Sequence, residues 1–184
     1  WTSRQSEWVH TGPKTLYFGG GTPSLLPLKN LKRVIDTLRT SNTTEITLEV
    51  NPGDVNPEKL RQYKDIGINR LSLGIQSFDR TQLRRLGRGT TPKDIHQLLS
   101  WVQQANFDSW SMDLMFGLPN QEFQQLKDDV TKMLSVQPPH VSLYGLTYKN
   151  GTPFFRALQS GSLKPIDEDE WVKQFEYITN TLQS

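Results

Sequence analysis

Five short apolar segments, each followed by a helical pattern, are the feature of this sequence that most constrains its fold. Strand–helix alternation is typical of a parallel sheet with helices on its outer face. Two architectures fit, a doubly wound sheet or part of a β/α barrel, and both place ligands at the carboxyl ends of the strands. The expected strands are Leu16–Phe18, Ile46–Val50, Arg70–Gln76, Trp110–Phe116 and Val141–Thr147.

Start and stop signals mark the helices between these strands. Asn56-Pro57 and Thr91-Pro92 each place a capping residue before a proline at the first helical position, and Gly67 lies where the first of these helices should end. Asn120 is expected to cap a later helix. Apolar residues recur at helical spacing on these helices, and the aromatic and methionine positions among them are expected to be core contacts. The apolar residues are Ile95, Leu98, Leu99, Val102, Phe123, Leu126, Val130, Met133, Leu134, Trp171, Phe175, Ile178 and Leu182.

Composition excludes several classes of function. The 184 residues suffice for one sizeable core, and 21 Lys+Arg against 19 Asp+Glu leave no basic block that would predict nucleic-acid binding. No apolar run approaches the roughly 18 residues that a membrane span needs. The chain has no cysteine, so it offers neither a disulfide nor a thiolate-ligated metal site. It begins at Trp1 and is expected to be a piece of a longer, cytoplasmic protein.

One face of the predicted strands is polar. Side chains alternate along a strand, so Thr47 and Glu49, Ser72 and Gln76, and Ser111 and Asp113 each share a face. A dry interior would leave such groups poorly satisfied, and a ligand-filled lumen resolves this. We therefore expect Glu49, Gln76 and Asp113 to contribute to a polar small-molecule site at the carboxyl ends of their strands.

The first expected strand runs directly into Gly19-Gly20-Gly21, a turn that suits either a tight reversal or backbone N–H groups facing a charged ligand. Arg88 can pair with a carboxylate or merely end a helix. His10, His96 and His140 are scattered. No nucleophile–base pair and no metal-ligand spacing appear, so no catalytic residue and no metal ligand is predicted.

Several motifs occur in order along the chain, namely Gly19–Ser24, Glu49–Gly53, Gly67–Phe78, Leu86–Arg88, Asp113–Pro119 and His140–Thr147. Together they resemble the radical S-adenosylmethionine enzymes of the oxygen-independent coproporphyrinogen III oxidase family, over about residues 15 to 155. The forms Glu-Val-Asn-Pro-Gly and Ile-Gln-Ser-Phe are closer to the haem-chaperone branch of that family.

The resemblance implies a partial (β/α) barrel with the first barrel strand missing, so that residues 1–184 form a single incomplete radical-SAM domain. It implies that Gly20, Gly21 and Thr22 contact the methionine part of S-adenosylmethionine or of a second copy of it, and that Glu49 binds this cofactor. Gln76, Arg88 and Asp113 would complete the cofactor region, with Thr147 at a weaker match.

Three departures from the family pattern matter. The family's Cys-x3-Cys-x2-Cys motif is missing, so the [4Fe–4S] cluster implied for the full-length protein has no ligands in this chain. Thr90 stands where the branch usually has a histidine. The family's C-terminal domain is also missing, and this chain alone is expected to be inactive.

Three functions follow as hypotheses. The first is the S-adenosylmethionine-binding core of an oxidoreductase whose 5′-deoxyadenosyl radical takes hydrogen from porphyrinogen propionates. The second is a chaperone that transfers haem without oxidase activity, and the third is an unrelated β/α enzyme that binds a phosphate at Gly19–Gly21. The expected partners are S-adenosylmethionine and porphyrin or haem. Self-association is expected through the unpaired strand edge at Leu16–Phe18.

Overall fold

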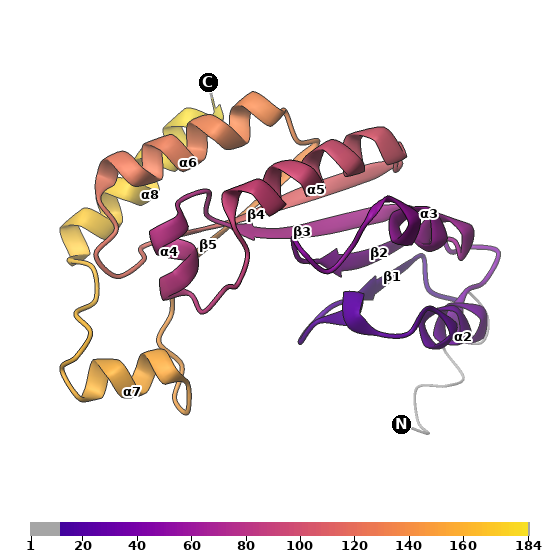
Figure 1. The fold of residues 1–184 in the computed structure, drawn as a ribbon, viewed down its shortest axis with the longest axis horizontal. Coiled ribbons are helices and arrows are strands. Elements are labelled where there is room, and N and C mark those ends of the chain that lie inside the picture. Colours follow the sequence, from indigo (N-terminus) through magenta and orange to yellow (C-terminus); the bar gives the residue numbers. More distant parts are fainter. Residues whose placement is uncertain (1–11, 184) are drawn as a thin grey trace. The chain divides into compact units, whose positions relative to one another are not determined.

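The computed structural model describes residues 12–183, and the inferences on Trp1 and His10 lie outside that range. The described chain contains a five-stranded sheet in the order β1-β2-β3-β4-β5 (Figure 1). The strands are β1 (Thr15–Phe18), β2 (Glu45–Val50), β3 (Arg70–Gln76), β4 (Ser109–Phe116) and β5 (His140–Gly145). The helices are the 3-10 turn η1 (Pro23–Leu25), α2 (Leu28–Leu38), α3 (Pro57–Asp65), α4 (Arg80–Arg85), α5 (Pro92–Ala105), α6 (Phe123–Val136), α7 (Pro153–Gln159) and α8 (Glu168–Gln183).

The strand order decides between the two expected architectures. Each strand lies beside the one that precedes it in the chain, and the pairings of β1 with β2 and of β2 with β3 are parallel. A doubly wound sheet reverses its strand order at a switch point, whereas a β/α barrel does not. The fold is therefore α/β, with five parallel strands of a partial barrel, as predicted.

The described residues form two compact units. The first unit comprises residues up to 74 together with 93–112, and the second comprises 75–92 and 113–183. The first contains β1, β2, α2, α3, α5 and the opening residues of β3 and β4. The second contains the closing residues of those two strands with α4, α6, β5, α7 and α8.

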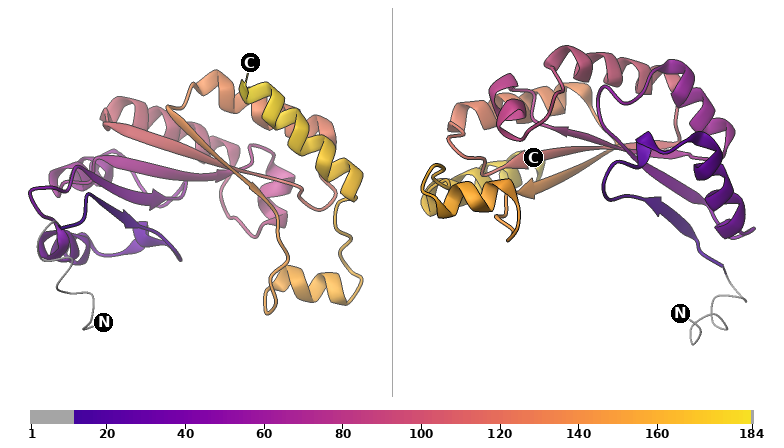
Figure 2. Two further views of the ribbon diagram at one scale, coloured as in Figure 1. Left: turned by 180° about the vertical axis from the view of Figure 1, so that it is seen from behind. Right: turned by 60° about the horizontal axis from the view of Figure 1, so that its bottom comes forward.

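The core of the first unit lies between its strands and its helices. Helices α2 and α3 lie on the same side of β1 and β2 in the views of Figures 1 and 2. Their inward residues are all but inaccessible to solvent, as are the apolar residues of the strands, which follows from the alternation of the pattern. This core includes Leu31, Ile35, Ile46, Leu48, Val50, Leu60, Tyr63, Leu71, Leu73, Ile95, Leu98 and Val102.

The polar face of these strands is also buried, and its hydroxyls are satisfied within the protein. Thr47, Ser72 and Ser111 are each at most 4% exposed. The Ser111 hydroxyl donates to Ser72 Oγ at 3.2 Å, and the Thr47 hydroxyl donates to Glu45 Oε1 at 3.1 Å. At these three positions the polar face needs no ligand to satisfy it, contrary to the expectation from the sequence.

The expected boundaries of α3 are confirmed at both ends. The Asn56 side chain accepts from the backbone N–H of Lys59 at 2.8 Å, with Pro57 at the first helical position. Gly67, at φ +96°, ends the helix, because its N–H donates to the Lys64 carbonyl at 2.8 Å.

The expected cap of α6 is wrong. The helix begins at Phe123 with Glu122 as its N-cap, and Glu122 and Gln125 form a reciprocal capping box. Asn120 lies before it in the left-handed region at φ +52° and shapes the loop instead.

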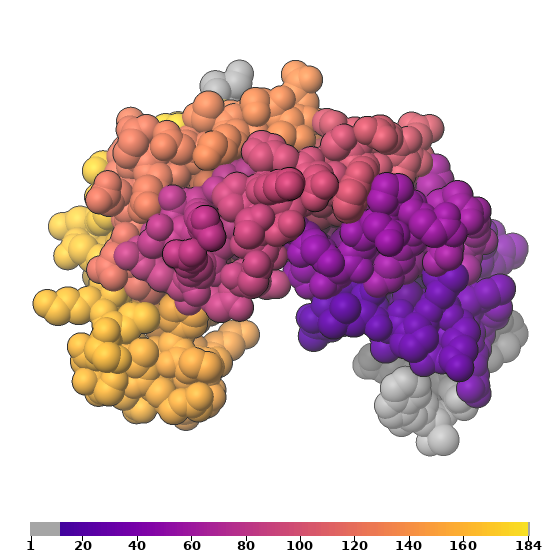
Figure 3. All heavy atoms as spheres, viewed as in Figure 1, coloured from indigo at the N-terminus to yellow at the C-terminus, as the bar shows by residue number. Residues whose placement is uncertain are grey.

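In the second unit, α6 and α8 pack side by side (Figure 2). Helix α7 buries no residue, and Figure 3 shows its atoms, in yellow-orange, protruding from this unit. Phe175 is 49% exposed, so its prediction as a core contact is wrong. Between residues 12 and 183 there is no helix with both the length and the apolar character needed to cross a membrane.

Candidate functional site

The glycine turn after β1 requires glycine for two different reasons, a close contact at one position and a positive φ at the other two. A Cβ at Gly19 would lie 2.5 Å from Cε1 of Tyr17 and 2.7 Å from Oε1 of Glu49. At Gly20 and Gly21 a Cβ would meet nothing within 4 Å, but φ is +76° and +59°. The turn therefore packs closely at Gly19 and leaves open space beside the backbone of Gly20 and Gly21.

Glu49, near the end of β2, is bonded to this turn. Its Oε2 accepts from the backbone N–H of Gly20 at 3.0 Å, and its Oε1 accepts from the Tyr17 hydroxyl at 2.8 Å. Each oxygen of a carboxylate has a second lone pair, so Glu49 retains acceptor capacity for a ligand. The structure thus brings together two of the residues predicted from the sequence, through contacts between β1 and β2 that the sequence did not reveal.

The far end of the glycine motif is fixed at Ser24, which is fully buried. The Ser24 hydroxyl donates to Asp54 Oδ2 at 2.8 Å, and the Ser24 carbonyl accepts from Lys59 Nζ at 2.7 Å and from the Tyr63 hydroxyl at 2.9 Å. Burial, and then the Asp54 carboxylate, raise the pKa of Tyr63 to about 12, so its hydroxyl keeps its proton and remains a donor.

Lys59 and Tyr63 were missed by sequence reasoning. They lie four residues apart on α3 and therefore share one face of the helix. In the sequence, only the i, i+4 spacing of these two hydrogen-bond donors could have drawn attention to them. That spacing does not show which acceptor the two side chains share. Their shared acceptor, the Ser24 carbonyl, anchors the end of the glycine motif to α3.

Thr22, also predicted, directly precedes η1 in the first unit, and its carbonyl accepts from the Leu25 N–H at 3.1 Å. The other predicted residues belong to the second unit. Gln76, the last residue of β3, has φ +69°, and the N–H of Ser77 donates to the Ile75 carbonyl at 2.9 Å. Asp113 lies in β4 and is 9% exposed. Thr147 is exposed and lies two residues beyond the end of β5 at Gly145, so its predicted place on the last strand is wrong.

The backbone of Arg88 completes the end of α4. Its N–H donates to the Leu83 carbonyl at 2.9 Å, and the N–H of Gly87 donates to the Arg84 carbonyl at 3.0 Å, which together form a Schellman motif. Gly87 supplies the left-handed residue at φ +69°. The backbone of Arg88 therefore performs the capping role that was proposed for this residue. These backbone bonds do not bear on whether the Arg88 side chain binds a ligand.

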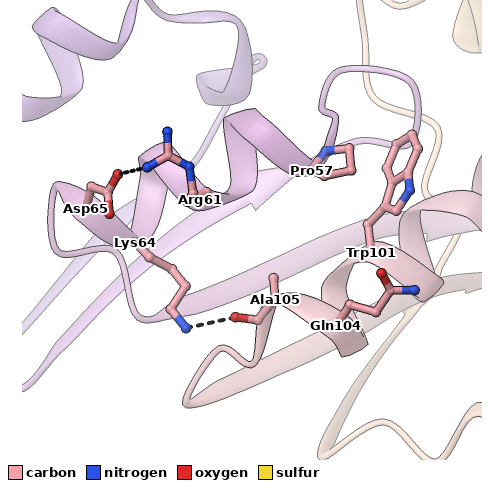
Figure 4. A pocket seen from close by; sticks show the side chains of 7 residues that line it. All are labelled: Pro57, Arg61, Lys64, Asp65, Trp101, Gln104 and Ala105. Atoms are coloured by element: carbon pink, nitrogen blue, oxygen red, sulfur yellow. Dashed lines mark hydrogen bonds and ion pairs between the residues drawn. The ribbon is translucent and has the colours of Figure 1, made fainter.

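A pocket of about 320 Å³ lies in the first unit between α3 and α5 (Figure 4). Its charged groups are already paired, because Lys64 Nζ donates to the Ala105 carbonyl at 2.8 Å and Arg61 pairs with Asp65 at 3.1 Å. The residues that line it are Pro57, Arg61, Lys64, Asp65, Trp101, Gln104 and Ala105, and none of these is a predicted site residue.

The described part of the chain does not gather side chains that bind metals. Within residues 12–183, no three His, Asp or Glu side chains gather closely enough to hold an ion. The whole sequence has no cysteine. In the first unit, the glycine turn offers a ligand the Glu49 carboxylate and an open backbone. In the second unit, Gln76 carries an amide and Arg88 a guanidinium. Groups of each kind suit a polar organic molecule better than a metal.

Comparison with known proteins gives consistent results. The family model of the Radical SAM superfamily matches residues 4–133. The heme chaperone HemW of Lactococcus lactis is 34% identical over 173 residues, which are 92% of this chain and 46% of that protein. The HemW of Bacillus subtilis is 32% identical over 176 residues, which are 93% of this chain and 46% of that protein. The chain therefore spans a little under half of the length of these relatives.

Solved structures show the same fold. The chain resembles coproporphyrinogen III oxidase (HemN) from Escherichia coli with a TM-score of 0.79 at 24% identity, over 92% of this chain and 40% of that one. It resembles the archaeal Elp3 of Methanocaldococcus infernus with a TM-score of 0.76 at 19% identity, over 96% and 48% of the two chains.

Proposed function

The chain belongs to the radical SAM superfamily, and from this premise we propose that it is the S-adenosylmethionine-binding core of a protein of porphyrin or haem metabolism. The observation that carries the proposal is the bond between Glu49 and the Gly20 N–H. It ties the family's glycine motif to a carboxylate that retains acceptor capacity. The alternative of an unrelated phosphate-binding enzyme is wrong, because the chain is a member of this superfamily.

The residues of the first unit suit the methionine part of S-adenosylmethionine. We assign to Gly20, Gly21 and Thr22 the contacts with its ammonium and carboxylate, since the space beside both glycines is open. Glu49 would accept hydrogen bonds from the ammonium or from the ribose. When bound, the cofactor supplies a sulfonium whose carbon–sulfur bond is the reactive one in this superfamily.

The residues of the second unit are assigned by the family motifs. Gln76 would form a hydrogen bond to the cofactor through its amide. Arg88 would pair with a carboxylate, and Asp113 would accept from hydroxyl groups. Thr147 is retained as the weakest member of the set.

The family's [4Fe–4S] cluster does not fit this chain, because such clusters are held by cysteine thiolates and the sequence has none. We propose that the full-length protein carries a Cys-x3-Cys-x2-Cys motif before Trp1 and that the present chain alone does not turn over. Sequencing the gene upstream of Trp1 tests this directly, and an intact gene without the motif would refute it.

Both activities in porphyrin metabolism are consistent with the fold. The two HemW haem chaperones at 34% and 32% identity favour the chaperone function for this protein. The oxidase function is supported by the structural likeness to HemN, at 24% identity. Stable haem binding and transfer by the full-length protein, without anaerobic conversion of coproporphyrinogen III, would support the chaperone. Conversion of coproporphyrinogen III would support the oxidase.

The site assignment is tested by Glu49→Ala in the full-length protein. We expect the affinity for S-adenosylmethionine to fall about tenfold, as for the loss of a hydrogen bond to a charged group, and Glu49→Gln to lose less. The measurement is isothermal titration calorimetry. The matched control is Glu58→Ala, which removes an exposed carboxylate of α3 that pairs with Arg61 on the helix surface. Equal affinity in the wild type and Glu49→Ala would refute the assignment.

A further inference from the structure

The end of β3 is held in a conformation that its own sequence does not favour. Gln76 has φ +69°, and the hydrogen bond from the Ser77 N–H to the Ile75 carbonyl closes a three-residue turn around it. This positive-φ γ-turn is rare and strained for a residue that carries a side chain. Such a conformation persists only where neighbouring groups fix the chain on at least one side of it.

A buried carboxylate from another element fixes the residues that follow Gln76. Asp129 of α6 is 2% exposed, and its Oδ2 accepts from the Ser77 hydroxyl at 2.6 Å. Its Oδ1 accepts from the Phe78 N–H at 2.8 Å. One carboxylate thus bonds two consecutive residues of the segment, one through the side chain and one through the backbone.

The same contacts continue into α4. The Ser77 Oγ, which donates to Asp129, accepts from the Asp79 N–H at 3.0 Å. The Asp79 side chain in turn caps α4 by accepting from the Gln82 N–H at 2.8 Å. A continuous series of hydrogen bonds thus connects Asp129 with the chain from the end of β3 to the first turn of α4.

Two charged side chains, Lys132 and Asp79, act on the carboxyl group of Asp129. Lys132, one turn further along α6, lies 6.0 Å from the centre of the Phe78 ring, and its charge lowers the pKa of Asp129. Asp79 acts in the opposite direction. Burial outweighs both and raises the pKa of Asp129 to about 6.

From this geometry we propose that Asp129 is a positioning residue, which holds the Gln76 turn in the conformation that presents the Gln76 amide to the cofactor. This rests on the proposed function, in which Gln76 contacts S-adenosylmethionine. Asp129 itself does not touch the cofactor in this proposal. It acts through Ser77 and Phe78.

The test is Asp129→Asn in the full-length protein, with Asp128→Asn as the matched control. Asp128 is the neighbouring carboxylate of α6, is exposed, and accepts a hydrogen bond from the Gln124 side chain of the same helix at 2.8 Å. An asparagine at 129 retains one acceptor and places an amide donor opposite Ser77. We expect S-adenosylmethionine to bind about tenfold more weakly, as for the loss of one charge-assisted hydrogen bond.

Two readouts separate positioning from a purely structural role. Amide hydrogen exchange, measured without cofactor, should become faster at Phe78 and Asp79 in Asp129→Asn and stay unchanged in Asp128→Asn. The affinity of the wild type for S-adenosylmethionine should weaken as the pH falls through about 6, where Asp129 gains its proton, and that of Asp129→Asn should not.

The outcomes distinguish this proposal from the one on which it rests. A folded Asp129→Asn protein with wild-type affinity would overturn the positioning role, while the effect of Glu49→Ala would still stand. Equal affinity in the wild type and Glu49→Ala would instead overturn the proposed function. If Asp129→Asn does not fold, Ser77→Ala removes one of the two bonds, and wild-type affinity and exchange in that variant would likewise overturn the proposal.

Discussion

At the scale of single residues, the protein keeps a carboxylate away from water in order to shape a loop. Asp129 is 2% exposed and accepts hydrogen bonds from Ser77 and Phe78, which favour its charged form, yet burial raises its pKa to about 6. Desolvation thus outweighs two good hydrogen bonds. Such a carboxyl group titrates close to the pH at which proteins are commonly studied.

This raised pKa predicts the pH dependence of stability. Between about pH 4 and pH 6 the unfolded chain releases the proton of Asp129 while the folded chain keeps it, so rising pH favours the unfolded state. The contribution of this group to the free energy of unfolding should fall by at most roughly 3 kcal/mol across that window and stay level above it. Urea unfolding at several pH values should show a steeper fall for the wild type than for Asp129→Asn. Parallel curves for the two proteins would contradict the prediction.

The polar set of Glu49, Gln76 and Asp113 was predicted from strand alternation, which says nothing of the backbone geometry of these residues. The positive φ of Gln76 could not be predicted, because glutamine carries no preference for that region and the group that imposes it lies 52 residues away from Ser77. Local propensity contains no information on such a partner.

At the scale of elements, α8 packs onto its unit through the indole of Trp171, which lies against Gly117 and Gly145. A Cβ at Gly145 would lie 3.0 Å from Cζ2 of Trp171, and one at Gly117 would lie 2.7 Å from Cδ1. Gln174 strengthens this contact, since its Oε1 accepts from the Gly117 N–H at 3.0 Å. The ring of Trp171 also stacks on that of Phe175, with centroids 5.6 Å apart.

The close packing of Trp171 on Gly145 predicts that substitutions at these two positions are energetically coupled. Gly145→Ala should lower the free energy of unfolding by about 1–3 kcal/mol, because the added methyl group crowds the indole. In a Trp171→Ala background the same change should cost less, since the nearest crowded group is gone and only Phe116 Cζ, 3.3 Å from the added Cβ, remains. Thermal or urea unfolding of the four proteins of this double-mutant cycle measures the difference. An equal cost in both backgrounds would show that the crowding lies elsewhere.

Helix boundaries were predicted correctly where several local sequence signals agree. Asn56-Pro57 and Gly67 fixed α3 because cap, first-turn proline and terminal glycine all agree. At the start of α6, Asn120 is the better cap by residue type, but the reciprocal bond with Gln125 makes Glu122 the cap. The choice depended on side-chain geometry and not on propensity.

At the scale of the whole molecule, β1 forms one edge of the sheet. Among the described strands it pairs with β2 alone. An edge strand presents unpaired N–H and carbonyl groups to other chains. The resemblance to the family had implied such an edge, because it implied a barrel without its first strand.

The exposed edge predicts self-association of the 184-residue chain. Light scattering should show a mass that increases with concentration, and Thr15→Lys, which adds a charge to an exposed position of β1, should reduce the association. Thr37→Lys on the exposed surface of α2 is the matched control. A monodisperse monomer at all concentrations would contradict the prediction.

The division into two units sets the order in which this protein can acquire its structure during synthesis. The first unit needs residues 93–112, so it cannot be completed until well after residues 75–92 of the second unit have left the ribosome. Those residues, with Ser77 among them, wait for Asp129, which is 52 positions further along the chain. At ordinary rates of translation this delay is roughly 3 to 10 s, during which the strained turn at Gln76 has no carboxylate to hold it. The conformation proposed to receive the cofactor is thus among the later features that the nascent chain can form.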